Sequence, residues 1–207
     1  MDRDYEALPI RELGAGAGFR RPLQAQSARV TLESPALEVM TDLTRITPAT
    51  IRPQAPLYGA NQFMITRGVR LLLVVDERED VLGVITATDL LGERPMLAAT
   101  SRGLRRDELT VADVMTGAES VEVVALADLE GARVGHVLET LRRLGRQHAL
   151  VVDFDDIPSG RPFVPAAKRA MVRGIFSISQ IARQLGVDVP AGAEVARTFS
   201  EIEAAIR

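Results

Sequence analysis

The chain switches between two hydrophobic patterns, and it does so in the same order twice. Leu71–Val75 is an unbroken apolar run, which is typical of a strand buried on both faces. From Val134 to Leu144, apolar residues instead recur every three or four positions, which predicts a helix with one apolar face. Polar and glycine-containing stretches separate these segments. The sequence therefore predicts a mixed fold of short strands and short helices.

Three short sequences recur in the same order, so the chain contains an internal repeat. Val-Met-Thr, Leu-Val-Val-Asp and a segment that begins with glycine each occur twice. The matching segments are 39–41 and 114–116, 73–76 and 150–153, and 83–86 and 174–177. The last two segments of the second copy are further apart than their counterparts, which places an insertion at about 154–171.

Each copy is predicted to have the order β-α-β-β-α. The first helices, at about 57–67 and 134–144, should end at Gly68 and Gly145, because glycine adopts the left-handed conformation at little cost. One such unit cannot cover its own sheet, so two should pack as a pseudo-symmetric pair. The predicted fold class is α/β in the broad sense, an α+β arrangement. The expected parts are an N-terminal arm (1–36), a first repeat (37–107), a second repeat (108–187) and a C-terminal amphipathic helix (188–207).

In these features the sequence resembles the CBS-domain (cystathionine-β-synthase-type) family, whose repeats work in pairs known as Bateman modules. The resemblance covers roughly residues 37–186. It implies a regulatory module and not an enzyme. It also implies that an adenine nucleotide (AMP, ADP, ATP or a related adenosyl ligand, with or without Mg²⁺) binds in the cleft between the repeats, and that the chain forms a homodimer.

The resemblance places a nucleotide site in the first repeat, where Thr86, Thr88 and Asp89 open a helix. A carboxylate can accept charge-assisted hydrogen bonds from ribose hydroxyls, and a helix start suits a phosphate. Alternatively, Thr88 or Asp89 only caps the helix, and Arg70 is an ordinary exposed charge at the start of a strand. The complete expected set is Thr86, Thr88, Asp89, Arg70 and Val121.

The second repeat departs from this pattern. Ser177 and Ser179 match the two hydroxyl positions, but Gln180 stands where the acid is expected. An amide can still bind a ribose, although without charge. The expected set for this second site is Thr44, Ser177, Ser179, Gln180 and His148. If the site has lost its ligand, the chain is instead a structural or protein-interaction module that acts through dimerisation.

Composition narrows the choice of function. The 207 residues are 46% hydrophobic and carry a net charge of −3, which argues against general binding to nucleic acid. The absence of cysteine excludes disulfides, thiolate metal sites and a cysteine nucleophile. The apolar runs are far shorter than the roughly 20 residues of a membrane span, and the first residues do not resemble a secretion signal. We expect a cytoplasmic protein without membrane contact, without a metal site and without catalytic residues.

Three segments remain outside the repeat pattern. Residues 1–36 have no clear period and form the expected arm. In the insertion, Asp153, Asp155 and Asp156 are interpreted as a solvated hairpin tip, and the rest as a surface excursion suited to an unidentified protein partner. The C-terminal helix should dock an apolar face, either on its own subunit or in a dimer contact. That face is made of Val195, Phe199, Ile202 and Ile206.

Overall fold

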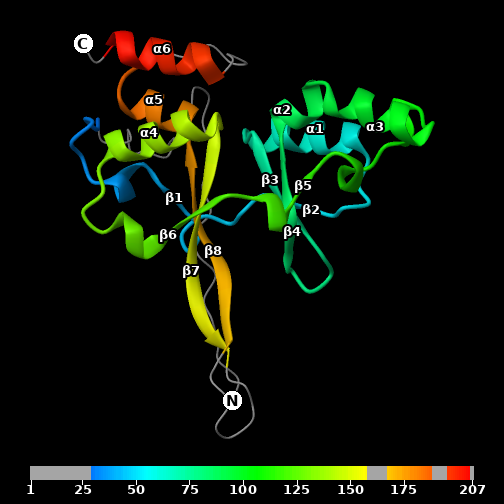
Figure 1. The fold of residues 1–207 in the computed structure, drawn as a ribbon, viewed down its shortest axis with the longest axis horizontal. Helices are drawn as coiled ribbons and strands as arrows, with labels where there is room; N and C mark the ends of the chain where they lie inside the picture. The colour runs from blue at the N-terminus through cyan, green and yellow to red at the C-terminus, as the bar shows by residue number, and fades with distance from the viewer. Residues whose placement is uncertain (1–28, 158–166, 188–194, 206–207) are drawn as a thin grey trace, which may run out of the picture.

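The structure is a computed structural model that describes residues 29–157, 167–187 and 195–205 (Figure 1). It contains two four-stranded sheets, each accompanied by helices. The first sheet has the order β2 (Thr50–Ile51), β3 (Leu71–Val75), β4 (Val81–Thr86), β5 (Thr116–Gly117). The second has the order β1 (Thr41–Asp42), β8 (Ala167–Ser177), β7 (His148–Ile157), β6 (Val123–Ala125).

The helices follow the predicted repeat. Those of the first repeat are α1 (Leu57–Arg67), α2 (Ala87–Leu91) and α3 (Arg94–Arg102). Those of the second are α4 (Val134–Leu144) and α5 (Ile178–Gln184), followed by α6 (Val195–Ala205). Short 3-10 turns complete the described chain at η1 (Ala36–Val39), η2 (Arg106–Glu108), η3 (Val111–Asp113), η4 (Ala118–Ser120) and η5 (Leu126–Leu129). The order β-α-β-β-α is confirmed in both copies, and Gly68 and Gly145 end their helices in the left-handed conformation.

Each sheet borrows one strand from the segment that leads into the other repeat. β1 lies near the start of the first repeat, before its β-α-β-β-α unit, but pairs with β8 of the second repeat, at Thr41 opposite Ile175. β5 has the same place in the second repeat but pairs with β4 of the first, at Thr116 opposite Val84. This exchange brings the segments that connect the repeats to the cleft between them.

Alternate residues of β3 serve two cores, which confirms that this strand is buried on both faces. Leu72 and Val74 pack with the helices of the first repeat, in a cluster that includes Met64. Leu71 and Leu73 point to the opposite face, where they pack with residues of the second repeat that include Leu150. The two sheets therefore face each other across a shared apolar layer.

The insertion lengthens β7 and β8 into a two-stranded ribbon that projects beyond the sheet (Figure 1). Asp153 and Asp155 are paired strand residues, opposite Met171 and Arg169. Their assignment to a hairpin tip was therefore wrong, because the strands continue past them; residues 158–166 lie outside the described residues. Arg169 forms an ion pair with Asp80 in the β3–β4 turn, so the ribbon contacts the first repeat.

The C-terminal helix docks on its own subunit. Phe199 and Ile202 of α6 are buried in the core of the second repeat, together with Leu141 and Ile181. Val30 joins the same core, and its backbone N–H donates to the Gln184 carbonyl. Most of the expected N-terminal arm (1–28) and Ile206 lie outside the described residues. The domain boundaries stay predictions.

Candidate functional site

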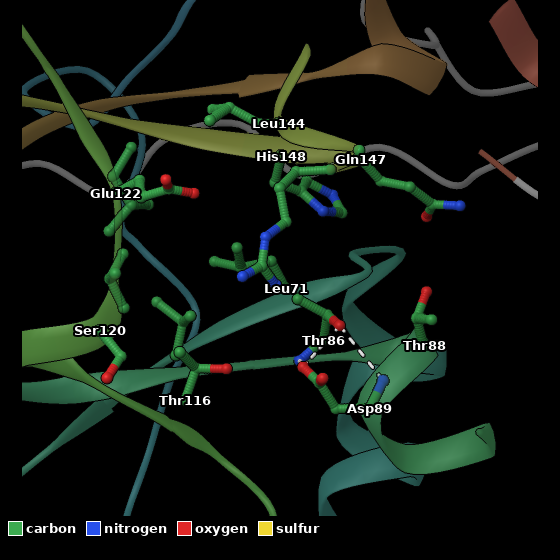
Figure 2. Close-up of a pocket in the computed structure, with 15 residues that line it drawn as sticks. Leu71, Thr86, Thr88, Asp89, Thr116, Ser120, Glu122, Leu144, Gln147 and His148 are labelled. Carbon is green, nitrogen blue, oxygen red and sulfur yellow. Dashed lines mark hydrogen bonds between the residues drawn. The ribbon is translucent and has the colours of Figure 1, made fainter. Parts of the chain in front are cut away.

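A pocket lies between the two repeats, and its walls come from both of them (Figure 2). Four of the five residues expected at the first site line it, namely Thr86, Thr88, Asp89 and Val121. The other lining residues are Leu71, Val84, Thr116, Ser120, Glu122, Leu144, Gly145, Arg146, Gln147, His148 and Leu150. The pocket therefore combines apolar strand residues, the start of α2, the segment between β5 and β6, and the α4–β7 connection.

Gly83 explains how the connecting segment reaches the pocket. It lies opposite Gly117 in the β4–β5 ladder, and a Cβ atom at Gly83 would lie 2.2 Å from the Thr116 carbonyl oxygen. Only glycine permits this approach. Gly174 has the same place in the second repeat, where a Cβ would lie 2.4 Å from the sulfur of Met40.

Thr86 and Asp89 form a capping box at the start of α2. The Asp89 N–H donates to Thr86 Oγ1 at 3.2 Å, while Asp89 Oδ2 accepts from the Thr86 N–H and hydroxyl at 2.9 and 2.7 Å. Thr86 is therefore the N-cap, and Asp89 takes part in capping as the third residue of the helix. This capping does not exclude a ligand role, because Asp89 also lines the pocket and Figure 2 shows it below the open space, beside Thr86.

Arg94, at the start of α3, joins Asp89 to the opposite wall. One of its terminal nitrogens lies 3.2 Å from Asp89 Oδ1 and donates to Thr116 Oγ1 at 2.9 Å and to the Val114 carbonyl at 3.2 Å. Asp89 is 12% exposed, so its charge is largely removed from solvent and needs this partner.

The pocket contains His148, which was expected at the second site, but not Arg70, which was expected at the first. His148 lines the pocket of Thr86 and Asp89, although it is also the ladder partner of Ser177. The two sheets pack against each other, so the start of β7 lines the same pocket as the start of α2.

Burial and charge keep His148 neutral. Burial is the larger cause, and the positive charge of Arg70 adds to it; together they lower the pKa of His148 to about 4. Arg146 and Gln147, which precede it, also line the pocket, as does Glu122 on the facing segment. Sequence reasoning did not predict Glu122 and Arg146 at the site. Glu122 lies in the predicted first strand of the second repeat and Arg146 follows its first helix, and these positions could have indicated them.

At the start of α5, the corresponding position in the second repeat, the polar side chains hydrogen-bond to other residues of the chain. The Thr41 hydroxyl donates to Gln180 Oε1 at 2.8 Å, and Ser177 Oγ lies 3.1 Å from Ser179 Oγ. Thr44 was expected to face these serines, but its N–H and hydroxyl both donate to Asp42 Oδ1, at 2.8 and 2.6 Å. It is Thr41, on β1, that contacts the start of α5, through Gln180.

Asp42 is held by a cation as well. Arg173 of β8 forms an ion pair with it, and this hydrogen bond, followed by that from the Thr44 hydroxyl, lowers the pKa of Asp42 well below its usual range.

Within the described ranges, no group of three or more His, Cys, Asp or Glu side chains could hold a metal ion. No described helix is long and apolar enough to cross a bilayer.

Comparison with known proteins identifies the first repeat. Residues 36–95 match the family model of the CBS domain, which confirms the resemblance noted in the sequence. A search of curated protein sequences found no match. An uncharacterized conserved protein from Pyrococcus horikoshii covers 79% of this chain and 100% of its own, with 18% identity and a TM-score of 0.51; at that identity the likeness shows a shared fold.

Two further solved structures are similar over a comparable length. CBSX2 from Arabidopsis thaliana, in complex with AMP, is 18% identical over 72% of this chain and 94% of its own, with a TM-score of 0.47. The CBS domain pair of protein MJ0100, in complex with 5-methylthioadenosine and S-adenosyl-L-methionine, is 19% identical over 74% of this chain and 96% of its own, with a TM-score of 0.46.

Proposed function

We propose that the chain, whose residues 36–95 match the family model of the CBS domain, is a regulatory module that binds an adenine nucleotide or a related adenosyl ligand between its two repeats. The observation that carries the proposal is the shared pocket. Thr86, Thr88 and Asp89 of the first repeat meet Val121 and His148 there, although these segments are far apart in the sequence.

The lining suits the three parts of a nucleotide. Leu71, Val84 and Leu150 provide an apolar wall for a base. Asp89 can accept hydrogen bonds from ribose hydroxyls, and such bonds to a charged group are the stronger ones. Arg146 and the Thr88 hydroxyl offer positive charge and hydrogen-bond donors for a phosphate.

We propose further that the module is not an enzyme and that it acts in the cytoplasm. CBS domains are generally regulatory rather than catalytic, and the pocket chemistry described above requires binding alone. His148 is the strongest candidate for a proton-transfer group in the pocket, but its pKa of about 4 leaves it neutral near pH 7, and a base held so far below its usual pKa is a weak proton acceptor.

The functional unit in this proposal is a homodimer that joins through the helices of the first repeat. These helices expose several large apolar side chains, namely Tyr58, Phe63, Ile65, Leu91, Met96 and Leu97. On the second repeat, α6 lies over α4 and α5 (Figure 1) and buries Phe199 and Ile202 there. An apolar surface of this kind usually marks an interaction site, so the uncovered helices are the better dimer contact.

A ligand-free interaction module is the second candidate. The hydrogen bond between Thr41 and Gln180 favours it, because it occupies the polar groups that a ligand would need in the second repeat. The same exposed helices would then carry the whole function. The two candidates differ at the first pocket, where only the nucleotide proposal requires Asp89 to bind a ligand.

A thermal melt with AMP, ADP, ATP and S-adenosylmethionine tests the proposal. A ligand at one hundred times its dissociation constant should add about 2.7 kcal/mol to the free energy of unfolding, and hence raise the melting temperature by several degrees. Inorganic phosphate serves as the control for non-specific anion effects. No shift with any of the four ligands would overturn nucleotide binding and leave the interaction module.

A further inference from the structure

The first repeat and the segment after it contain the same capping arrangement twice. At the start of α2, the backbone and hydroxyl of Thr86 donate to Asp89 Oδ2. At the start of η3, the backbone and hydroxyl of Thr110 donate to Asp113 Oδ2 at 2.7 and 2.9 Å. Each carboxylate is mostly buried, with 12% of Asp89 and 8% of Asp113 exposed.

Each of these carboxylates also receives an arginine from α3. Arg94, the first residue of the helix, reaches Asp89 Oδ1, and Arg102, its last residue, reaches Asp113 Oδ1. The two arginines are exposed to a similar extent, 44% and 57%. The two carboxylates therefore have the same kinds of donor, a threonine backbone and hydroxyl and an arginine, but only Asp89 lines the pocket between the repeats.

Arg94 makes two further hydrogen bonds that have no counterpart for Arg102 among the described residues. Besides contacting Asp89, it donates to the Thr116 hydroxyl and the Val114 carbonyl, and Thr116 also lines the pocket. The Arg94 guanidinium thus links the start of α2 to β5. These two segments are far apart in the sequence, and the link holds them at a fixed distance across the pocket. Arg102 holds a cap outside this pocket.

We propose that Arg94 is a positioning residue for nucleotide binding, acting through Asp89 and Thr116. This inference rests on the proposed function. The Thr86 backbone and hydroxyl already use Oδ2 of Asp89, so Oδ1 is the oxygen with acceptor capacity left for a ribose hydroxyl. Arg94 holds that oxygen in place and stabilises its charge at low exposure, where an unpaired carboxylate is costly.

The test measures AMP affinity by calorimetric titration of the full chain. Arg94→Ala should weaken AMP binding about tenfold, which is the effect of losing one charged hydrogen-bond partner. Arg94→Lys should recover part of the loss, because it restores the charge without the planar fork that contacts two walls. Arg102→Ala removes the matched arginine and should leave AMP affinity unchanged.

A double-mutant cycle separates positioning from a general loss of stability. Asp89→Asn and Arg94→Ala should be non-additive in AMP affinity, because the two side chains act through one contact. Asp89→Asn and Arg102→Ala should be additive. If Arg94→Ala does not fold, Arg94→Lys and Thr116→Val replace it, since each removes part of the Arg94 contacts.

The outcomes distinguish this inference from the proposed function. A wild-type chain that binds none of the adenine ligands overturns the proposed function and this inference together. A wild-type chain that binds AMP through Asp89, with equal effects of the Arg94 and Arg102 variants or an additive Asp89–Arg94 cycle, overturns the role of Arg94 alone.

Discussion

The two repeats have the same order of elements, but they differ in the polar residues at the start of the helix that follows the strand pair. In the first repeat, a Thr86–Asp89 capping box opens the helix at the pocket. In the second, Ser177 makes no side-chain cap, and Gln180 accepts from Thr41 instead. The pattern of apolar residues thus specifies the fold of both copies, while a few polar residues distinguish the copy that we propose to bind a ligand from the other copy.

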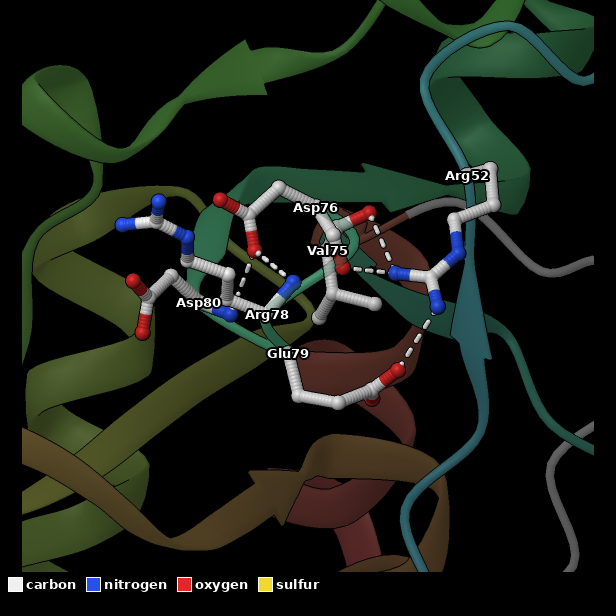
Figure 3. Close-up of polar contacts among 6 residues, drawn as sticks. All are labelled: Arg52, Val75, Asp76, Arg78, Glu79 and Asp80. Carbon is white, nitrogen blue, oxygen red and sulfur yellow. Dashed lines mark hydrogen bonds and ion pairs between the residues drawn. The ribbon is translucent and has the colours of Figure 1, made fainter.

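The Leu-Val-Val-Asp sequence that both repeats share also has a different structural role in each. In the first repeat, Asp76 Oδ1 accepts from the N–H groups of Arg78 and Asp80, both at 2.9 Å, and so closes the β3–β4 turn (Figure 3). Arg52 braces this turn by donating to the Val75 carbonyl. In the second repeat, Asp153 lies within the longer β7 instead. The same residue type therefore ends one strand and continues another, because the turn that comes after Asp76 is replaced by the insertion after Asp153.

Placing charges on the uncovered helices of the first repeat should disrupt the proposed homodimer. Leu91 and Leu97 are 71% and 60% exposed, so Leu91→Glu with Leu97→Glu should barely change the free energy of unfolding. In the proposed homodimer, burying these charges at the contact costs several kcal/mol, so its dissociation constant should rise at least a hundredfold.

Sedimentation equilibrium of the double variant at micromolar concentration checks this expectation. Phe154→Glu is the matched control, because Phe154 is also exposed but lies on the β7–β8 ribbon of the second repeat. It should leave the dimer intact. A double variant that stays dimeric would move the contact away from the first repeat.

The second test compares the two matched carboxylates. Asp89→Ala should lower AMP affinity by about ten- to a hundredfold, because it removes one or two charge-assisted hydrogen bonds worth roughly 1.5–3 kcal/mol. Asp113→Ala should leave AMP affinity unchanged, although both substitutions remove a helix cap of about 1 kcal/mol. Calorimetric titration gives the affinities, and urea unfolding confirms that the two stability losses are comparable.

Asp89→Asn adds a sharper control to this pair. Asparagine caps a helix well, but it lacks the charge that strengthens bonds to ribose hydroxyls. It should therefore keep most of the stability and lose part of the affinity. An Asp89→Asn protein with unchanged AMP affinity would reduce Asp89 to a cap and favour the interaction module.

The sequence was sufficient to predict those features that depend on local pattern. The predicted helices at 57–67 and 134–144 have the bounds of α1 and α4, because apolar spacing and a terminal glycine are both visible within one turn. That His148 lines this pocket and Arg70 does not depends on how the sheets pack, which no local pattern encodes. Arg94 was missed for a related reason, since its partners Asp89 and Thr116 belong to different segments.

The third prediction concerns His148, at the boundary between the repeats. Its pKa of about 4 in the folded protein lies below its ordinary value of about 6.5. Between these pH values, His148 is protonated in the unfolded chain but stays neutral in the folded chain. The free energy of unfolding should therefore fall as the pH is lowered from 7 to 5. The loss should be about 1–2 kcal/mol for this half-buried side chain.

Urea unfolding at pH 7 and pH 5 measures this slope. Arg70, which directly precedes β3, is one charged group near His148. The others line the pocket and are Arg146, Glu122 and Asp89. His148→Gln removes the imidazole and should flatten the slope, while His136→Gln, which changes the chain's other histidine, should leave it in place. An unchanged slope in His148→Gln would show that other groups titrate.

The smallest expected effect comes from giving the second repeat the acid that it lacks. Ser177 and Gln180 have the same spacing as Thr86 and Asp89, so Gln180→Asp can complete a capping box at the start of α5. The gain should be about 0.5–1 kcal/mol, reduced by the loss of the hydrogen bond from Thr41. Thermal melting against Gln180→Asn, which keeps an amide, measures the net change.

The same variant tests whether an acid alone makes a binding site. Leu185 stands five residues after Gln180, where the first repeat has Arg94 five residues after Asp89. Without an arginine there, the new carboxylate lacks a partner that holds its second oxygen toward a ligand. Calorimetry on Gln180→Asp should therefore show AMP binding at the first pocket with unchanged affinity and a second event at least tenfold weaker. A second site equal to the first would mean that the acid suffices and that the rest of the second repeat's cleft is already competent.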